Sequence, residues 1–364
     1  MGFKCGIIGL PNVGKSTIFN ALTAAGAEVA NYPFCTINPN IGVVPVPDPR
    51  LEKIAAIIHP RTFTFTTMEF VDIAGLVRGA SKGEGLGNRF LANIRDVDAI
   101  VHIVRCFDNP DVAHIHGEVS PAEDIAVVEM ELVLADIETV ERRIEKAEKS
   151  AKGGDKSHRS ELELCYKVLE SLGGNIPVRR VDLTSDEEVL LRDLNLITAK
   201  KVLYVANVDE PNLREGSGYV DAVGEIARAD RSEVIVICGD MEAEIAALPE
   251  EDRREFLDDL GLRESGLQKL IRAGYDMLGL ITFYTTAGDQ LRAWTIPEGT
   301  KAIQAAGKIH TDMERGFIRA EILRYEDFVR AGGVLAAKEQ GLVRIEGKEH
   351  PIADGDIVYF RFNV

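Results

Sequence analysis

The residues whose spacing most clearly suggests chemistry lie near the start of the chain. Gly9, Gly14, Lys15 and Ser16 form the pattern Gly-x4-Gly-Lys-Ser. Glycines let backbone N–H groups curl around phosphate oxygens, and a helix that follows adds the positive end of its dipole. A lysine can bridge terminal phosphates, and a serine hydroxyl can bind Mg²⁺. The pattern therefore predicts a loop that binds the phosphates of a nucleotide.

The segments on either side of this loop fit that prediction. The apolar residues 5–8 predict a buried strand, and residues 16–23 predict the start of a helix. The loop should therefore contact the nucleotide through six consecutive residues: Asn12, Val13, Gly14, Lys15, Ser16 and Thr17.

A second motif follows another apolar strand, "EFVDIAG", and consists of Asp72-x-x-Gly75. Asp72 is expected to hold Mg²⁺ through water, and the Gly75 N–H to contact the γ-phosphate and sense its loss. Between the two motifs, Thr36 is placed to give Mg²⁺ a second hydroxyl. The predicted metal site thus comprises Ser16, Thr36 and Asp72. This order of motifs is typical of a switch NTPase.

The base-reading segment is Asn207-Val208-Asp209-Glu210, after the apolar run "VLYVA". Guanine readers usually show Asn-Lys-x-Asp here, with a carboxylate that accepts two hydrogen bonds. The extra methylene of Glu210 moves its carboxylate by about 1.5 Å, so it cannot occupy the same position. We expect relaxed purine choice, with Asn207 reading a purine amine. Alternatively, Glu210 is a solvated charge, and specificity falls to the loop at 238–240.

At this point the motifs identify a family. GLPNVGKST, NYPFCT, DIAGLVRGASKGEGLGNRFL and NVDE closely resemble the Obg-like ATPase family, in its YchF subgroup. The resemblance covers essentially the whole chain, and "IHTDMERGFIRAEI" and "DGDIVYFRFNV" resemble that family's TGS domain. It implies that ATP is preferred or accepted, and that GTP can also bind.

Hydrolysis needs a group that orients the attacking water, and Leu76 stands where many switch GTPases have glutamine. The resemblance points to His114 as a catalytic residue, and a histidine has suitable acid–base chemistry. Lys15 is the second residue with a predicted catalytic role, through its charge at the terminal phosphates. Alternatively, His114 is an ordinary surface-loop histidine without a catalytic role, as we expect His116 to be. Related NTPases with asparagine at the position of Asn12 can bind K⁺, but an asparagine also suits a turn.

The predicted fold class is α/β: a P-loop NTPase with a Ras-like doubly wound sheet, an inserted helical hairpin and a C-terminal β-grasp (TGS) domain. We expect the nucleotide-binding domain at 1–125 and 200–280, a helical, coiled-coil arm at 126–199 and the TGS domain at 281–364. Within 122–172, apolar residues recur at helical spacing and Gly153-Gly154 break the run, which predicts two antiparallel helices. A further helix should begin at Ser185, with Glu188 completing a capping box.

Composition restricts the class of partner. The net charge of −17 argues against a generally basic nucleic-acid surface, although a local basic face remains compatible with it. The basic residues at 142–159 are either such a face for RNA or a solvated helix surface. By resemblance, the partner is the ribosome or structured RNA. Five scattered cysteines and no signal peptide or long apolar span predict a cytoplasmic protein, not bound to membranes, that we expect to be a monomer.

Together these features predict a Mg²⁺-dependent ATPase, able to take GTP, that acts as a slow switch. Three alternatives stay open: a GTP-specific ribosome-associated GTPase, a module that binds ATP without turnover, and a metabolic phosphotransferase. The last would need an acceptor pocket and a base near the γ-phosphate, for which the sequence shows no carboxylate motif.

Overall fold

A computed structural model describes residues 3–27, 40–73, 86–112, 114, 117–151 and 156–363. The chain forms two compact units, and each contains a six-stranded sheet. The first unit comprises Met1–Val43 and Glu69–Leu270, and the second comprises Val44–Met68 and Ile271–Val364.

The sheet of the first unit has the strand order β2-β4-β1-β5-β6-β7, and the neighbours from β4 to β7 are parallel. Every residue of β5 and β6 is buried, because a parallel sheet is covered by helices on both faces. The strands are β1 (Lys4–Ile8), β2 (Ile41–Pro45), β4 (Thr67–Asp72), β5 (Ala99–Arg105), β6 (Val202–Asn207) and β7 (Val234–Ile237).

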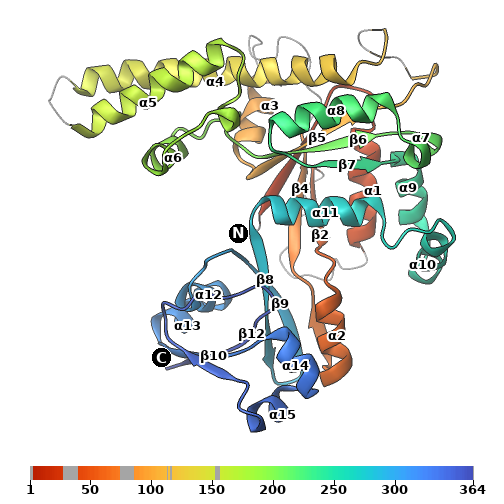
Figure 1. Ribbon diagram of the computed structural model, residues 1–364, viewed down its shortest axis with the longest axis vertical. Helices are drawn as coiled ribbons and strands as arrows, with labels where there is room; N and C mark the ends of the chain where they lie inside the picture. The colour runs from red at the N-terminus through yellow and green to blue at the C-terminus, as the bar shows by residue number, and fades with distance from the viewer. Residues whose placement is uncertain are drawn as a thin grey trace. The chain divides into compact units, whose positions relative to one another are not determined.

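Helices lie on both sides of these strands, with α8 on one side and α1 on the other in Figure 1. This arrangement is the predicted doubly wound α/β fold, with the carboxyl ends of the parallel strands at one edge. The helices are α1 (Lys15–Ala27), α3 (Leu86–Arg95), α7 (Glu210–Glu215), α8 (Gly218–Ala229), α9 (Gly239–Ala247), α10 (Glu250–Asp259) and α11 (Gly266–Met277).

The predicted helical arm is present as α4 (Pro121–Ala151) and α5 (Lys156–Gly173), which pack against each other through apolar side chains such as Val140 and Val168. A 3-10 turn, η1 (Val178–Arg180), and α6 (Ser185–Arg192) lead back to the sheet. The α6 capping box uses Thr184 and Glu187, one residue earlier than predicted. Ser185 and Glu188 have the same spacing, so the sequence pattern alone could not separate the two registers.

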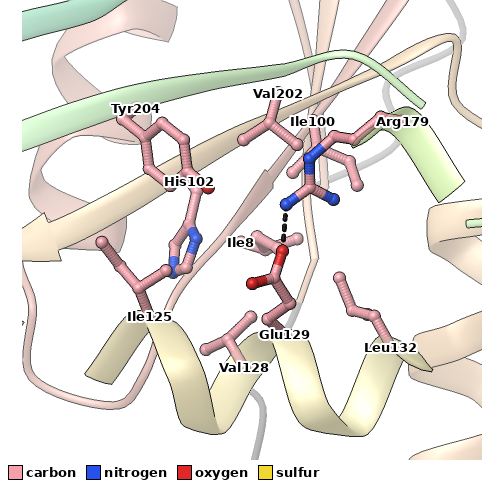
Figure 2. Close-up of a pocket in the computed structure, with 10 residues that line it drawn as sticks. All are labelled: Ile8, Ile100, His102, Ile125, Val128, Glu129, Leu132, Arg179, Val202 and Tyr204. Carbon is pink, nitrogen blue, oxygen red and sulfur yellow. Dashed lines mark hydrogen bonds and ion pairs between the residues drawn. The ribbon is translucent and has the colours of Figure 1, made fainter. Parts of the chain in front are cut away.

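A buried polar cluster fastens the arm to the sheet (Figure 2). Arg179 pairs with Glu129 of α4 and donates from Nε to Asp230 over 2.8 Å, and the Tyr204 hydroxyl donates to Asp230 over 2.7 Å. Burial, and then the nearby Arg179 guanidinium, lower the pKa of His102 to about 3. His102 is therefore neutral at physiological pH. The charges of the cluster come from Arg179, from Arg180, which also pairs with Glu129 and Asp230, and from these two carboxylates.

The sheet of the second unit has the order β11-β10-β12-β8-β9-β3. Its strands are β3 (Thr62–Thr64), β8 (Leu280–Ala287), β9 (Gln290–Pro297), β10 (Phe317–Leu323), β11 (Arg344–Glu346) and β12 (Ile357–Phe362). Its helices are α2 (Pro49–Ile58), α12 (Ala302–Ile309), α13 (Thr311–Arg315), α14 (Tyr325–Ala331) and α15 (Val334–Glu339). Helix α12 packs on one face, and α2 and α14 pack on part of the other.

The structural boundary differs from the predicted domain limits of 1–125 and 281–364. Residues 44–68 belong to the second unit, because β3 pairs with β9 and α2 contributes to the apolar core around Tyr284. The guanidinium of Arg50 also lies 2.6 Å from the Asp354 carboxylate. Residues 44–68 lie between two motifs of the first unit, and their composition does not differ from that of their neighbours. The sequence therefore did not reveal that they belong to the second unit.

Within the described part of the chain, no helix is both long and apolar enough to cross a membrane.

Candidate nucleotide-binding site

The loop between β1 and α1 is held against its neighbours so closely that two of its glycines cannot carry a side chain. A Cβ atom at Gly9 would lie 2.6 Å from the carbonyl oxygen of Ile103. At Gly14, φ is 89°, and a Cβ atom would lie 2.2 Å from Nδ2 of Asn207. The two glycines of the sequence pattern are therefore required by the fold of the loop, independently of any ligand.

The loop exposes groups that suit an anion. The first hydrogen bond of α1 runs from the Ile18 N–H to the Gly14 carbonyl over 3.0 Å, so the N–H groups before Ile18 have no acceptor within the helix. Ser16 is exposed in the first turn, and Asn12 is exposed with φ of 63°. Asparagine adopts this left-handed conformation more readily than most residues, which accounts for Asn12 as a turn residue and leaves its predicted K⁺ role untested.

Lys15 and Asp72 connect the loop with the end of β4. Their Nζ and Oδ1 atoms are 2.6 Å apart, and their side chains are 11% and 22% exposed. The positive charge expected at the terminal phosphates thus lies beside the carboxylate expected near Mg²⁺. A bound triphosphate would compete with Asp72 for Lys15, since phosphate oxygens also carry negative charge.

Asn207, at the end of β6, fastens the loop to the start of α9. Its Nδ2 donates to the Val13 carbonyl over 2.9 Å, and its Oδ1 accepts from the Gly239 N–H over 2.9 Å. The side chain is buried, with 4% exposed. A purine amine needs an acceptor, and the Oδ1 that could accept from it already accepts from the Gly239 N–H. The contacts of Asn207 in this structure therefore hold the loop.

The other residues of the predicted base-reading segment face in different directions. Val208 is 2% exposed and lies in the core. Glu210 is the first residue of α7, where Asp209 is the N-cap, and it pairs with Arg214 over 3.2 Å. The Glu210 side chain is 63% exposed. This environment matches a solvated charge at a helix N-terminus more closely than a group already positioned for a base.

Arg105 shapes the loop that follows β5, a feature that the sequence analysis missed. Its guanidinium is buried and donates to the carbonyls of Phe107, Asn109 and Val112 over 3.0–3.2 Å. A buried arginine bonded to three backbone carbonyls of one short loop fixes the path of that loop. The signal available in the sequence was an arginine at the end of an apolar strand, directly before a polar loop.

His114 follows this loop and contacts α4. Its Nε2 lies 3.0 Å from Oδ2 of Asp124, and the two side chains are 5% and 3% exposed. The second carboxylate oxygen of Asp124 is buried and makes no hydrogen bond to the described residues. Burial, and then this carboxylate, raise the pKa of the Cys106 thiol to about 12, which keeps the thiol protonated.

Part of the predicted metal and phosphate site lies outside the described residues. Thr36 and Gly75 belong to that part, as do Leu76 and His116. The donors that are described, the exposed Ser16 hydroxyl and the Asp72 carboxylate, are hard oxygens that suit Mg²⁺. No group of three or more His, Cys, Asp or Glu side chains within the described ranges could hold a metal by itself. A metal here would therefore need oxygens from the nucleotide or water as well.

Comparison with known proteins gives consistent matches over the whole chain. Residues 4–164 match a family model described as a 50S ribosome-binding GTPase, and residues 280–363 match the YchF GTPase C-terminal model, described as a protein of unknown function. The chain is 54% identical to the ribosome-binding ATPase YchF of Pasteurella multocida over 364 residues, and 51% identical to that of Bacillus subtilis over 366 residues. In both comparisons the match covers 100% of each protein.

A solved structure agrees with these relatives. The YchF GTPase of Schizosaccharomyces pombe superimposes with a TM-score of 0.90 at 36% identity, and the match covers 99% of this chain and 98% of that one. The predicted family and fold class are confirmed, and the chain belongs to the YchF subgroup of the Obg-like P-loop NTPases.

Proposed function

We propose that this protein is a Mg²⁺-dependent ATPase that also accepts GTP, and that it acts as a slow nucleotide-driven switch on the ribosome. The observation that carries the proposal is the glycine loop of β1–α1, with Lys15 paired to Asp72 at its mouth. Support for the nucleotide and the partner comes from the relatives, which are named ribosome-binding ATPases.

Binding would begin with an exchange of partners at Lys15. The triphosphate takes the place of Asp72 beside the ammonium group, and the N–H groups at the start of α1 donate to phosphate oxygens. Asp72 then becomes free to accept hydrogen bonds from water near the phosphates. The Lys15 charge is thus compensated both before and after the nucleotide binds, which avoids the cost of leaving a mostly buried cation unpaired.

The Ser16 hydroxyl, Thr36 and the Asp72 carboxylate would hold Mg²⁺. When bound, Mg²⁺ supplies positive charge that offsets the charge of the phosphates. If a K⁺ ion assists hydrolysis, we assign Asn12 as the residue that binds it.

Hydrolysis would proceed by attack of water on the γ-phosphorus. The bond to the β,γ-bridging oxygen breaks, and the products are NDP and inorganic phosphate. We assign His114 to orient this water, because Leu76 can neither donate nor accept a hydrogen bond. The contact of the buried His114 ring with Asp124 must break first, so this pair would keep turnover slow until the loop rearranges.

Purine choice would be loose. The Oδ1 of Asn207 and one of its Nδ2 hydrogens form hydrogen bonds within the protein, and Glu210 is exposed on α7. A site with few prepositioned groups for guanine leaves little buried and unpaired when adenine binds, and so discriminates weakly.

The proposed setting is the cytoplasm, with the protein acting as a monomer. We assign the ribosome, or structured RNA within it, as the partner, and the helical arm and the second unit as the parts that contact it.

A phosphate-release assay with purified protein tests this function. ATP should be hydrolysed without any added acceptor, and Lys15→Ala should abolish both hydrolysis and Mg²⁺-dependent binding. Tight ATP binding without phosphate release, with or without ribosomes, would favour a non-hydrolysing regulatory module. Release that required an added acceptor would favour a phosphotransferase.

A further inference from the structure

The sheet of the second unit carries one face that is only partly covered. Arg319 lies opposite Arg361, and Glu321 lies opposite both Tyr359 and Ile345. Residues opposite each other in a sheet point to the same face, and so do alternate residues along a strand. These five residues therefore share the face of β10, β11 and β12 opposite α12, beyond the apolar core formed by α2 and α14.

The charges on this face are unbalanced. Glu321 accepts from Arg361 Nε over 2.9 Å, from Lys338 Nζ over 3.3 Å and from Arg319 Nη2 over 3.5 Å. The hydrogen bond from Arg361 lowers the pKa of Glu321, which keeps it ionised. Among the described residues, Glu321 is the only carboxylate paired with these three cations, so two of the positive charges exceed it, in a chain whose net charge is −17. Each of the three cations remains 45–47% exposed.

A flat aromatic surface lies among these cations. The guanidinium carbon of Arg361 is 4.3 Å from the centre of the Tyr359 ring. Tyr359 is 45% exposed and Ile345 65% exposed. Glu321 fixes the guanidinium of Arg361, so less side-chain entropy is lost when a ligand binds there. In Figure 1, β10 and β12 lie beside each other in this unit.

We propose that Arg319, Lys338, Ile345, Tyr359 and Arg361 form a binding surface for unpaired RNA. Phosphates would contact Arg319 and Lys338, and a base would stack on Tyr359 and Arg361. An acidic peptide would use the cations but gain little from a stacked ring, which is why the surface favours nucleic acid. The inference deepens the proposed ribosomal function, on which it rests, by naming the chemistry of the contact.

The test uses the full-length protein and a fluorescein-labelled ten-nucleotide RNA without self-complementarity, followed by fluorescence anisotropy. Tyr359→Ala should weaken binding about 5- to 160-fold, the range for losing one base–aromatic stack. Lys338→Gln should reduce the slope of log affinity against log salt by about 0.7, as expected for one lost phosphate contact on a single strand.

Matched controls come from the same unit. Phe63 is 45% exposed and Arg330 is 65% exposed, and both lie outside the proposed surface. Phe63→Ala and Arg330→Gln should bind the RNA like the unchanged protein. Thermal unfolding of each variant, followed by circular dichroism, checks that all of them are folded.

Three results would overturn the proposal: Tyr359→Ala binding as tightly as the unchanged protein, duplex RNA binding as tightly as the single strand, or deca-glutamate competing as well as RNA. Affinity for a fluorescent ATP analogue, measured separately, keeps the two proposals distinct. A protein that binds the ATP analogue but not the RNA would refute this surface alone. A protein that binds the RNA but not the ATP analogue would refute the proposed ATPase.

Discussion

Replacing Asn207 by alanine should loosen the phosphate loop by a calculable amount. The change leaves the Val13 carbonyl and the Gly239 N–H without their side-chain partner in a site where Asn207 itself is 4% exposed. An unsatisfied buried backbone group costs about 1–3 kcal/mol, so two would cost about 2–6 kcal/mol. Some relaxation or entry of water should reduce this, and we expect a loss of about 2–4 kcal/mol in the free energy of unfolding.

The assay combines urea unfolding with titration of fluorescent ATP and GTP analogues. Asn212→Ala is the matched control, because the Asn212 side chain bonds to Asp209 on the partly exposed α7. It should change the unfolding free energy by less than about 0.5 kcal/mol. Since Asn207 holds the loop and not a particular base, its loss should weaken ATP and GTP binding by similar factors.

Two results would contradict the role of Asn207 in holding the loop. An unfolding free energy for Asn207→Ala within about 0.5 kcal/mol of the unchanged protein would show that the two bonds do not hold the loop. Selective loss of affinity for one purine would show that Asn207 reads the base, as the sequence first suggested.

Three further predictions concern other groups. The pKa of His102 is about 3 in the folded protein and 6.5 in the unfolded chain, so the unfolded chain takes up a proton first and the folded state loses stability as the pH falls below 6.5. Lowering the pH from 6.5 to 5 should reduce the free energy of unfolding, measured in urea, by about 2 kcal/mol on account of His102. This part of the loss should be absent in His102→Gln. Asp124→Asn should raise basal phosphate release about 5-fold, the equivalent of about 1 kcal/mol, and an equal rise in a His114→Ala background would contradict the assigned pairing. Asp72→Asn should remove most of the Mg²⁺ dependence of nucleotide binding, measured by titrations with and without EDTA. An unaltered Mg²⁺ dependence would show that Asp72 does not help to hold the metal.

Local patterns in the sequence were sufficient to predict much of the first unit. The glycine–lysine–serine motif lies between a strand and a helix as expected, because the same backbone conformation is needed whether or not a ligand is bound. The helical arm was also predictable, since apolar residues at helical spacing form the seam between α4 and α5. What these patterns could not reveal was long-range pairing, such as β3 with β9, which assigns residues 44–68 to the second unit.

The contacts made by the candidate site residues could not be predicted from the sequence. Asn207 was expected to read a base, and its side chain bonds to the phosphate loop. Val208, the next residue of the motif, is buried in the core. Neighbouring residues at the end of a strand point in opposite directions, and the motif does not say which direction faces the ligand. Likewise, nothing near His114 in the sequence predicts its contact with Asp124, which depends on how α4 begins.

The most direct test of the proposed nucleotide site is the affinity of the purified protein for ATP and for GTP, measured side by side with and without Mg²⁺. We expect Mg²⁺-dependent binding of both, with affinities that differ by less than about tenfold, or about 1.4 kcal/mol. Absence of Mg²⁺-dependent binding of either nucleotide would contradict it. A preference for GTP of about 10⁴-fold, as expected of a site built to hydrogen-bond guanine, would contradict it equally.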